Sequence, residues 1–295
     1  MAWTRRQFLS RTTVLGAAVT AGCSSRLGGT PLADPDAEVI AAPSSSAPAA
    51  QAVTIGILNY RPYTIEEGGE VTGPVPEVAR AVLGQLGVTD IKFQLLADEQ
   101  VMVPALAAGQ LDMVGGLAVR KDLCASLEFS QPDYVSGTAL IVPAGNPKGL
   151  STYADVKAKG AKVAVMQQLP EQTDVAKAGI AAANVVALPE PNAMMTAVRD
   201  GRVDCAAFDD LSSRELVKSF GGSLTTAKPF PPPDRLPLVG AYAFPKESTE
   251  LRQSFDNRLR DLHESGDWLA IVTPFGLSPE HAPPPELTAE QACGR

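Results

Sequence analysis

The side chains best suited to hold a small solute are two tyrosines and two acids. Tyr60 and Tyr63 stand three residues apart in a segment that follows an apolar strand candidate. Asp209 follows another apolar stretch, and Glu99 stands near the expected start of a helix. Aromatic faces attract cations and carboxylates pair with them, so this set predicts a site for a cation. The structural alternatives are ordinary packing for the tyrosines and helix capping for the acids.

The cysteines and histidines predict no metal centre. The chain has two histidines, His263 and His281, and four cysteines without metal-site spacing, Cys23, Cys124, Cys205 and Cys293. Cys205 lies in an apolar strand candidate, so we expect it to be a buried small hydrophobe. Outside the cytoplasm one disulfide can form, and our hypothesis pairs Cys124 with Cys293. We predict no metal and no cofactor.

A phrase that occurs twice indicates how these residues are positioned. Residues 105–114 and 197–206 each read as a helix end, a Gly stop and a short apolar strand that opens on Asp. Gly109 pairs with Gly201 and Asp112 with Asp204, so both offsets are 92 residues. A unit repeated at this distance predicts two lobes built on one plan.

Strands and helices alternate along both halves, which predicts an α/β fold with helix-covered central sheets. We expect strands at residues 53–58, 91–95, 111–115, 162–166, 185–188 and 203–208. We expect helices at residues 75–86, 101–108, 153–159, 171–177, 193–200, 211–220 and 250–264.

Two segments look like crossings between the lobes, at residues 138–142 and 238–244. If the second crossing returns the chain, lobe 1 comprises residues 51–140 plus 243–295, and lobe 2 comprises residues 141–242. Two crossover strands form a hinge, and a ligand would bind between the lobes.

The start of the chain reads as an export signal and a tether. Residues 4–9 match the twin-arginine pattern, and the apolar run at 13–22 is too short for a permanent membrane span. Residues 20–23 resemble a lipoprotein box, which predicts a signal peptide at 1–22 and a lipid on Cys23; a plain secretory peptide is the alternative. Residues 23–50 are rich in Ala, Ser and Pro and predict a flexible tether. We therefore expect an exported protein that is lipid-anchored to the outer face of the cell membrane.

The net charge of −8 argues against nucleic acid and against broad adhesion to anionic membranes.

Several phrases resemble the family 3 extracellular solute-binding proteins of bacterial ABC importers. They lie at residues 59–63, 73–79, 127–134 and 244–246, together with both copies of the repeat. Cys124 and residues 145–150 and 274–277 are most similar to the branch that binds ectoine and hydroxyectoine. The resemblance implies the two-lobed, type II periplasmic-binding-protein fold with a hinge of two crossover strands.

The chain departs from the family where a ligand carboxylate is held. The resemblance implies an Arg at the position of Leu123, a Thr at that of Arg120 and a Ser at that of Ala118. It also implies a Gly-Thr pair where Gln168 and Leu169 stand. Leu cannot pair with a carboxylate, so these changes together predict a ligand that lacks one.

The resemblance also implies roles for the residues that are kept. Asp209 falls where family members place the acid that pairs with the ligand amine, and Tyr60 and Tyr63 fall where aromatic groups sandwich the ligand. Glu99 lies near another aromatic position. The candidate ligand-binding set is Tyr60, Tyr63, Glu99, Gly116, Ala118, Arg120, Gln168 and Asp209. Arg61 or Arg120 could take over the carboxylate contact.

We expect a monomeric binding protein, not an enzyme, that closes around a small polar solute and presents it to a membrane permease. The solute would be amino-acid-like, a compatible solute or a cationic amine. One alternative is a periplasmic enzyme on the same fold, similar to cyclohexadienyl dehydratase, with Glu99 and Asp209 as acid–base groups. The other is a ligand-sensing surface protein.

Overall fold

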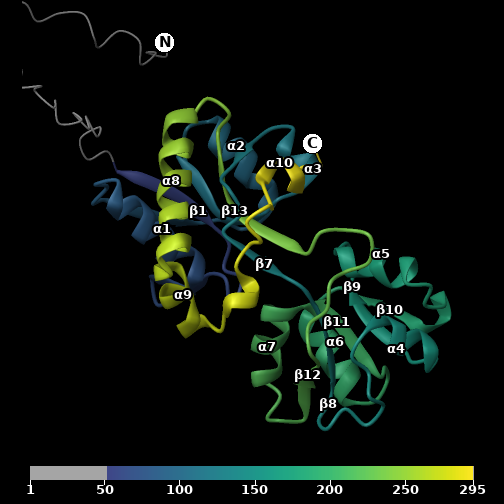
Figure 1. Cartoon of the computed structure of the whole chain (residues 1–295). Coiled ribbons are helices and arrows are strands. Elements are labelled where there is room, and N and C mark those ends of the chain that lie inside the picture. The colour runs from purple at the N-terminus through teal and green to yellow at the C-terminus, as the bar shows by residue number, and fades with distance from the viewer. Residues whose placement is uncertain (1–51, 295) are drawn as a thin grey trace, which may run out of the picture. The chain divides into compact units, whose positions relative to one another are not determined.

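Two mixed β-sheets, each covered by helices on both faces, carry the fold (Figure 1). This computed structural model describes residues 52–294. The expected signal peptide, Cys23 and nearly all of the tether lie outside the described residues.

The first sheet has the strand order β4-β1-β5-β13-β6, and β7 also pairs with β13. β1 is parallel to β4 and β5, whereas β13 is antiparallel to β5, β6 and β7. The strands are β1 Val53–Ile57, β4 Ile91–Leu95, β5 Met113–Ala118, β6 Glu128–Phe129, β7 Tyr134–Ser136 and β13 Leu238–Phe244. A small hairpin of β2 Ile65–Glu67 and β3 Glu70–Thr72 follows β1.

The second sheet has the order β10-β9-β11-β8-β12. β9 is parallel to β10 and β11, and β8 is antiparallel to β11 and β12. Its strands are β8 Thr138–Pro143, β9 Val163–Met166, β10 Val185–Leu188, β11 Cys205–Asp209 and β12 Leu224–Thr226. Both sheets thus place the second, first and third parallel strands side by side and add an antiparallel strand next to the third.

The repeated phrase performs the same structural task in both sheets. The carboxylate of Asp112 accepts the N–H of Thr54, and that of Asp204 accepts the N–H of Lys162, at 2.8 and 2.7 Å. Each acid thereby fixes the start of the neighbouring parallel strand. Gly109 and Gly201 have φ of 65° and 69°, which are left-handed values suited to Gly directly after a helix. The repeat therefore belongs to the fold and not to the chemistry.

Apolar faces of the helices explain the packing on the first sheet. α1 Pro74–Gln85, α8 Thr249–Ser265 and α9 Asp267–Val272 contribute Val78, Phe255 and Trp268 to one buried cluster. α2 Met102–Ala107, α3 Lys121–Cys124 and α10 Ala289–Ala292 lie on the opposite face, as Figure 1 shows.

The second sheet is covered in the same way. α4 Tyr153–Ala158 and α5 Pro170–Lys177 pack on one face, and α6 Pro191–Arg199 and α7 Asp210–Lys218 pack on the other. No helix within residues 52–294 is both long and apolar enough to cross a membrane.

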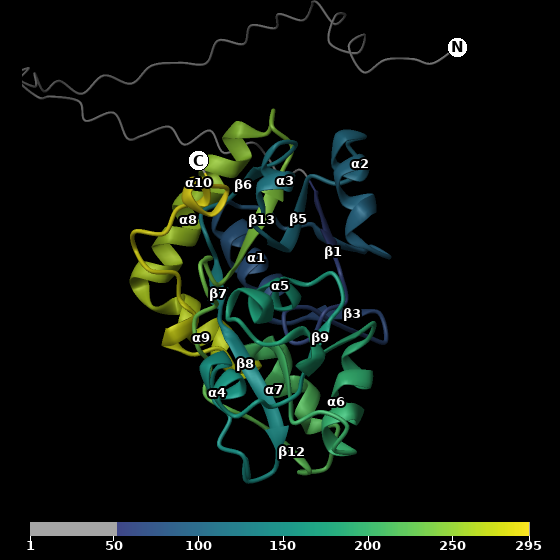
Figure 2. The same cartoon turned by 90° about the vertical axis from the view of Figure 1, so that its right-hand side faces the viewer.

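The expected crossing strands are full members of the sheets and not free connectors. β7 of the first sheet leads into β8 of the second across Gly137, as Figure 2 shows. The return runs through residues 227–237, between β12 and β13. The chain thus passes between the sheets at Gly137 and at residues 227–237, just before the strands β8 and β13 that were expected to cross. The lobe boundaries stay a prediction.

Cys124 and Cys293 form a disulfide, with 5.9 Å between their Cα atoms. The bond ties α3 to the segment that follows α10, and therefore secures the C-terminal end of the described chain to the first sheet. Cys205 is a free thiol that is buried in β11.

Candidate functional site

Three tyrosine rings stack at the junction of the two sheets. Tyr60 and Tyr63 are nearly parallel, with ring centroids 5.7 Å apart, and Tyr63 lies 4.9 Å from Tyr134. Tyr63 and Tyr134 are buried, whereas Tyr60, at the outer end of the stack, is 41% exposed. The stack forms an aromatic wall that starts in the first sheet and reaches outward.

Asp209 meets this wall from the second sheet. It is the last residue of β11 and the N-cap of α7, where its Oδ1 accepts the N–H of Ser212 at 3.0 Å. The Tyr63 hydroxyl donates to the same oxygen at 2.7 Å, and the Tyr60 hydroxyl donates to Oδ2 at 3.4 Å. The helix-capping role and the solute-binding role expected for Asp209 are therefore compatible.

Burial makes this acid costly to ionise. Burial raises the pKa of Asp209 above its usual value, although hydrogen bonds from Ser212 and Tyr63 counteract part of the effect. Burial and the Asp209 charge also raise the pKa values of Tyr60 and Tyr63, so both phenols stay protonated as donors. Among the described residues, 52–294, the donors to Asp209 are neutral, and no cationic side chain pairs with its carboxylate.

The depth of the aromatic wall is set by a glycine behind it. Gly240 of β13 pairs with Tyr134 of β7, and a Cβ at Gly240 would lie 2.0 Å from the Tyr134 ring. Tyr134 therefore occupies the space where a side chain on β13 would stand. The sequence reasoning did not single out either residue as part of the site.

A second group of predicted residues forms an ion pair. Arg120, the N-cap of α3, makes a two-pronged contact with the Glu99 carboxylate and lies 3.4 Å from Asp122. Hydrogen bonds with Glu99 raise the pKa of Arg120 further. Within residues 52–294 no hydrogen bond joins this pair to Asp209 or the tyrosines. Arg120 is thus already engaged by carboxylates of the protein.

The remaining predicted positions supply backbone shape and no charge. Gln168 has φ of 65°, the left-handed geometry that favours the Gly expected there, and Leu169 is the N-cap of α5. Gly116, with φ of 69°, packs against Val75, and Ala118 ends β5. Leu123 is partly buried beside the apolar cluster that contains Cys124.

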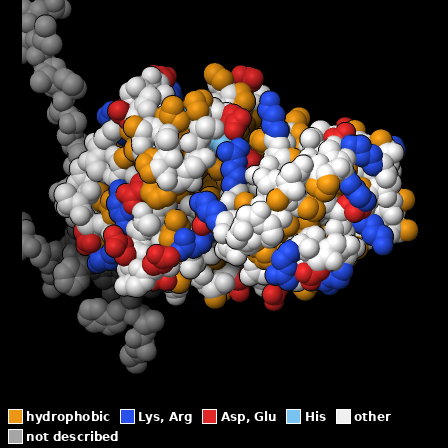
Figure 3. Space-filling model, turned by 90° about the horizontal axis from the view of Figure 1, so that it is seen from below, with side chains coloured by type: hydrophobic (Ala, Val, Ile, Leu, Met, Phe, Trp, Pro, Cys, Tyr) orange, Lys and Arg blue, Asp and Glu red, His pale blue; other side chains and the backbone are white. Residues whose placement is uncertain are grey.

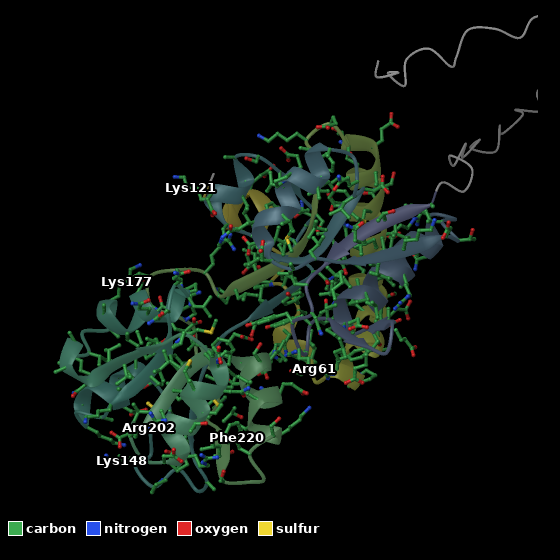
Figure 4. The ribbon with its side chains drawn as sticks, turned by 180° about the vertical axis from the view of Figure 1, so that it is seen from behind. Arg61, Lys121, Lys148, Lys177, Arg202 and Phe220 are labelled. Carbon is green, nitrogen blue, oxygen red and sulfur yellow. A yellow bond between two sulfur atoms is a disulfide. The ribbon has the colours of Figure 1, made fainter. Side chains whose placement is uncertain are left out.

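Arg61 lies near the junction and is paired with an acid. Figure 4 labels Arg61 there; its guanidinium contacts Glu67, and its carbonyl accepts from Ser212 at 3.3 Å. Lys148 and Arg202 lie at the far end of the second sheet in the same view. Figure 3 shows basic and acidic side chains intermixed in the middle of the face seen from below. Arg61 and Arg120, the two expected substitutes for the carboxylate contact that is missing at Leu123, each pair with a carboxylate of the protein.

A cluster of possible metal ligands lies beside the site. Ligand atoms of Asp210, Glu280 and His281 lie within 4.8 Å of one another. Arg214 already contacts Asp210 at 2.7 Å and Glu280 at 3.3 Å, and His281 Nε2 lies 3.3 Å from Asp210. Burial opposes ionisation of Asp210, but hydrogen bonds from His281 and Arg214 lower its pKa overall. The guanidinium of Arg214 thus pairs with two of these three groups.

Glu171 is a buried acid that the sequence reasoning missed. It stands in the first turn of α5, 6% exposed, at the sheet edge where Asp209 ends the neighbouring strand β11. Burial raises its pKa to about 7. An acid at a helix start normally reflects the helix dipole, so the sequence offered no distinct signal for it.

Residues 53–277 are similar in sequence to a known family of proteins. The family model described as "Bacterial extracellular solute-binding proteins, family 3" matches residues 53–277. A probable amino-acid ABC transporter periplasmic-binding protein of Sinorhizobium fredii is 29% identical over 250 residues, which cover 82% of each chain.

Solved structures show the same fold. A crystal structure of EhuB in complex with hydroxyectoine is similar with a TM-score of 0.61 and 29% identity, over 82% of this chain and 93% of that one. An ancestral arginine-binding protein bound to glutamine has a TM-score of 0.58 and 22% identity, over 76% of this chain and 97% of that one. The type II periplasmic-binding-protein fold follows from these matches.

Proposed function

This chain belongs to the bacterial extracellular solute-binding proteins of family 3, and we propose that it captures a small cation that lacks a carboxylate. It would deliver this solute to the permease of an ABC importer. The observation that carries the proposal is the buried carboxylate of Asp209: among residues 52–294 its donors are neutral, and two of them are the hydroxyls of the stacked Tyr60 and Tyr63.

The charge balance supports a cation over an amino acid. A zwitterion needs a positive partner for its carboxylate, but Leu123 stands where the family's Arg is expected. Arg120 and Arg61 are held by Glu99 and Glu67. A positive solute group would pair with Asp209 and lie against the tyrosines, a contact that contributes about 0.5–2 kcal/mol depending on desolvation.

The expected mechanism is closure about the two passages between the sheets. A solute that pairs with Asp209 of the second sheet and lies against Tyr60, the exposed outer ring of the stack, bridges the two sheets and favours the closed arrangement. It can shift that equilibrium only by the difference between its affinities for the two arrangements. The permease would recognise the closed form.

A thermal-shift screen tests the proposal. It compares carboxylate-free amines and quaternary ammonium compounds with hydroxyectoine, glutamine and arginine, the last three taken from ligands named for similar proteins. We expect the first group to raise the melting temperature more. A clear preference for a zwitterionic amino acid would contradict the proposal.

We also propose that the protein is a lipoprotein anchored through Cys23. The lipoprotein-like box at residues 20–23 and the tether rich in Ala, Ser and Pro support this. Membrane fractionation of cells that express the wild type or Cys23→Ala tests it. Release of only the variant into the soluble fraction is expected, and equal distribution of both would contradict lipid anchoring.

A further inference from the structure

Glu171 lies at the same sheet edge as Asp209. β9 and β11 are parallel neighbours, so the loop that leads into α5 and the end of β11 meet on one side of the second sheet. Asp209 occupies one of these ends and Glu171 the first turn of the helix at the other. Both acids are 6% exposed.

The acids here outnumber the available cations. Arg235 lies 3.6 Å from Glu171, but its Nε and Nη2 donate to Asp174 at 2.6 to 3.1 Å. Arg235 is therefore committed mainly to Asp174. Glu171 and Asp174 thus share one guanidinium, and within residues 52–294 Asp209 accepts hydrogen bonds from neutral donors alone.

Glu171 also interacts electrostatically with the groups of the site. The Glu171 charge adds to that of Asp209 in raising the pKa of the Tyr60 hydroxyl, and Asp209 in turn raises the pKa of Glu171 after burial. This agrees with the placement of Glu171 and Asp209 at one edge of the second sheet.

A buried hydroxyl on the same face of the second sheet also lacks a partner among the described residues. The Tyr153 hydroxyl makes no hydrogen bond with the described residues, although Tyr153 is only 4% exposed. Thr138 is near enough to affect its pKa, but not in hydrogen-bonding geometry. After burial, the Glu171 charge is the main cause that raises the pKa of Tyr153. Glu171 of α5 and Tyr153 of α4 therefore offer an anion and an unused hydroxyl on the same face of the second sheet.

We propose that Glu171 is a second anionic contact for the solute, so that the solute carries two cationic groups. One group pairs with Asp209 beside the tyrosines, and the other pairs with Glu171. The solute class is then a linear diamine or a guanidino-amine. This inference rests on the proposed function, because it assumes that a cation binds at Asp209.

Isothermal titration with 1,4-diaminobutane and 1-aminobutane tests the inference, since the two probes differ by one cationic group. We expect the wild type to bind the diamine at least about tenfold more tightly than 1-aminobutane. This is more than the factor of two expected because the diamine can bind through either of its identical ends. Glu171→Gln should remove this preference and leave the affinity for 1-aminobutane nearly unchanged.

Glu190→Gln is the matched control. Glu190 is the exposed N-cap of α6, which follows β10 at the same sheet edge, and it forms no capping hydrogen bond. This variant should keep the wild-type preference. If Glu171→Gln folds poorly, Glu171→Asp keeps the charge but draws it back by one methylene, and should weaken only the diamine.

The outcomes separate the two proposals. Equal affinity of the wild type for both amines, or an undiminished preference in Glu171→Gln, would overturn the second contact while a cation site at Asp209 stands. Binding of neither amine would overturn the cation site, and the second contact with it.

Discussion

Replacing Asp209 with Asn should weaken solute binding without weakening the fold. Asn caps helices about as well as Asp, so the bond from the Ser212 N–H is retained, and an amide oxygen can still accept from Tyr63. The negative charge is lost, which should cost about 2–3 kcal/mol in a charge-assisted contact, or about 30- to 150-fold in Kd.

Without solute, the Asp209→Asn variant should be as stable as the wild type or slightly more stable. Burial raises the pKa of Asp209, so the ionised form costs free energy in the folded state. That cost is present when the pH lies above the folded-state pKa, and the neutral amide removes it. We expect the Asn variant to melt at the wild-type temperature or slightly above it at pH 8.

Two further variants complete the experiment. Asp209→Ala loses the cap and leaves the Tyr63 hydroxyl unpaired, so it should lose affinity and also about 1–3 kcal/mol of unfolding free energy. Asp204→Asn makes the same charge change at the opposite end of β11, where Lys148 is the partner, and should leave affinity within about twofold. Calorimetric titration and thermal melts measure both quantities. Wild-type affinity in Asp209→Asn would refute the role of this carboxylate.

Three other changes test separate parts of the structure. Leu123→Arg should create a measurable affinity for zwitterionic amino acids by titration, because it returns a carboxylate partner to α3. Asp133→Asn should change how the unfolding free energy depends on pH, because burial raises the pKa of Asp133 to about 7. In the wild type, the contribution of the protonated Asp133 to stability is complete below the unfolded-state pKa and is lost as pH rises through about 7. Between pH 4 and 7, the unfolding free energy of the variant relative to that of the wild type should therefore rise by up to about 4 kcal/mol, as measured by denaturant titration. Replacing Cys124 and Cys293 with Ala should lower the unfolding free energy by about 5 kcal/mol, because the disulfide spans a sequence separation of 169 residues.

Each of these changes has a control. Lys121→Arg, on the exposed side of α3, should leave the affinity for amino acids unchanged. If Leu123→Arg binds no amino acid, another position excludes carboxylates. Parallel pH profiles for Asp133→Asn and the wild type would contradict the assigned pKa. Cys205→Ala removes the buried free thiol, and a loss as large as that of the double variant would show that the effect is not due to the disulfide.

Periodic segments of the fold could be predicted from the sequence, because each buries one face. α1 and β9 lie within a residue or so of their expected ranges. The two copies of the repeat correctly indicated two sheets of one plan, since Asp112 and Asp204 make equivalent contacts. The hairpin of β2 and β3 and the short β7 were missed, because three residues carry too little pattern.

The site was only partly accessible from the sequence. Tyr60, Tyr63 and Asp209 were proposed together, and the structure brings them into hydrogen-bonding contact. Arg120 and Glu99 were proposed separately as solute contacts, but their pairing depends on how β4 and β5 bring α2 and α3 together. Glu171 could not be found, because its burial depends on tertiary packing around Arg235.

The glycine behind the aromatic wall has a consequence for how solute preference can change. Any side chain at position 240 would displace the ring of Tyr134, on which Tyr63 stacks. The room left for a solute can therefore be altered by selection at a position that the solute never touches. Relatives with identical contact residues can then accept solutes of different thickness, and comparisons restricted to those contacts would miss the cause.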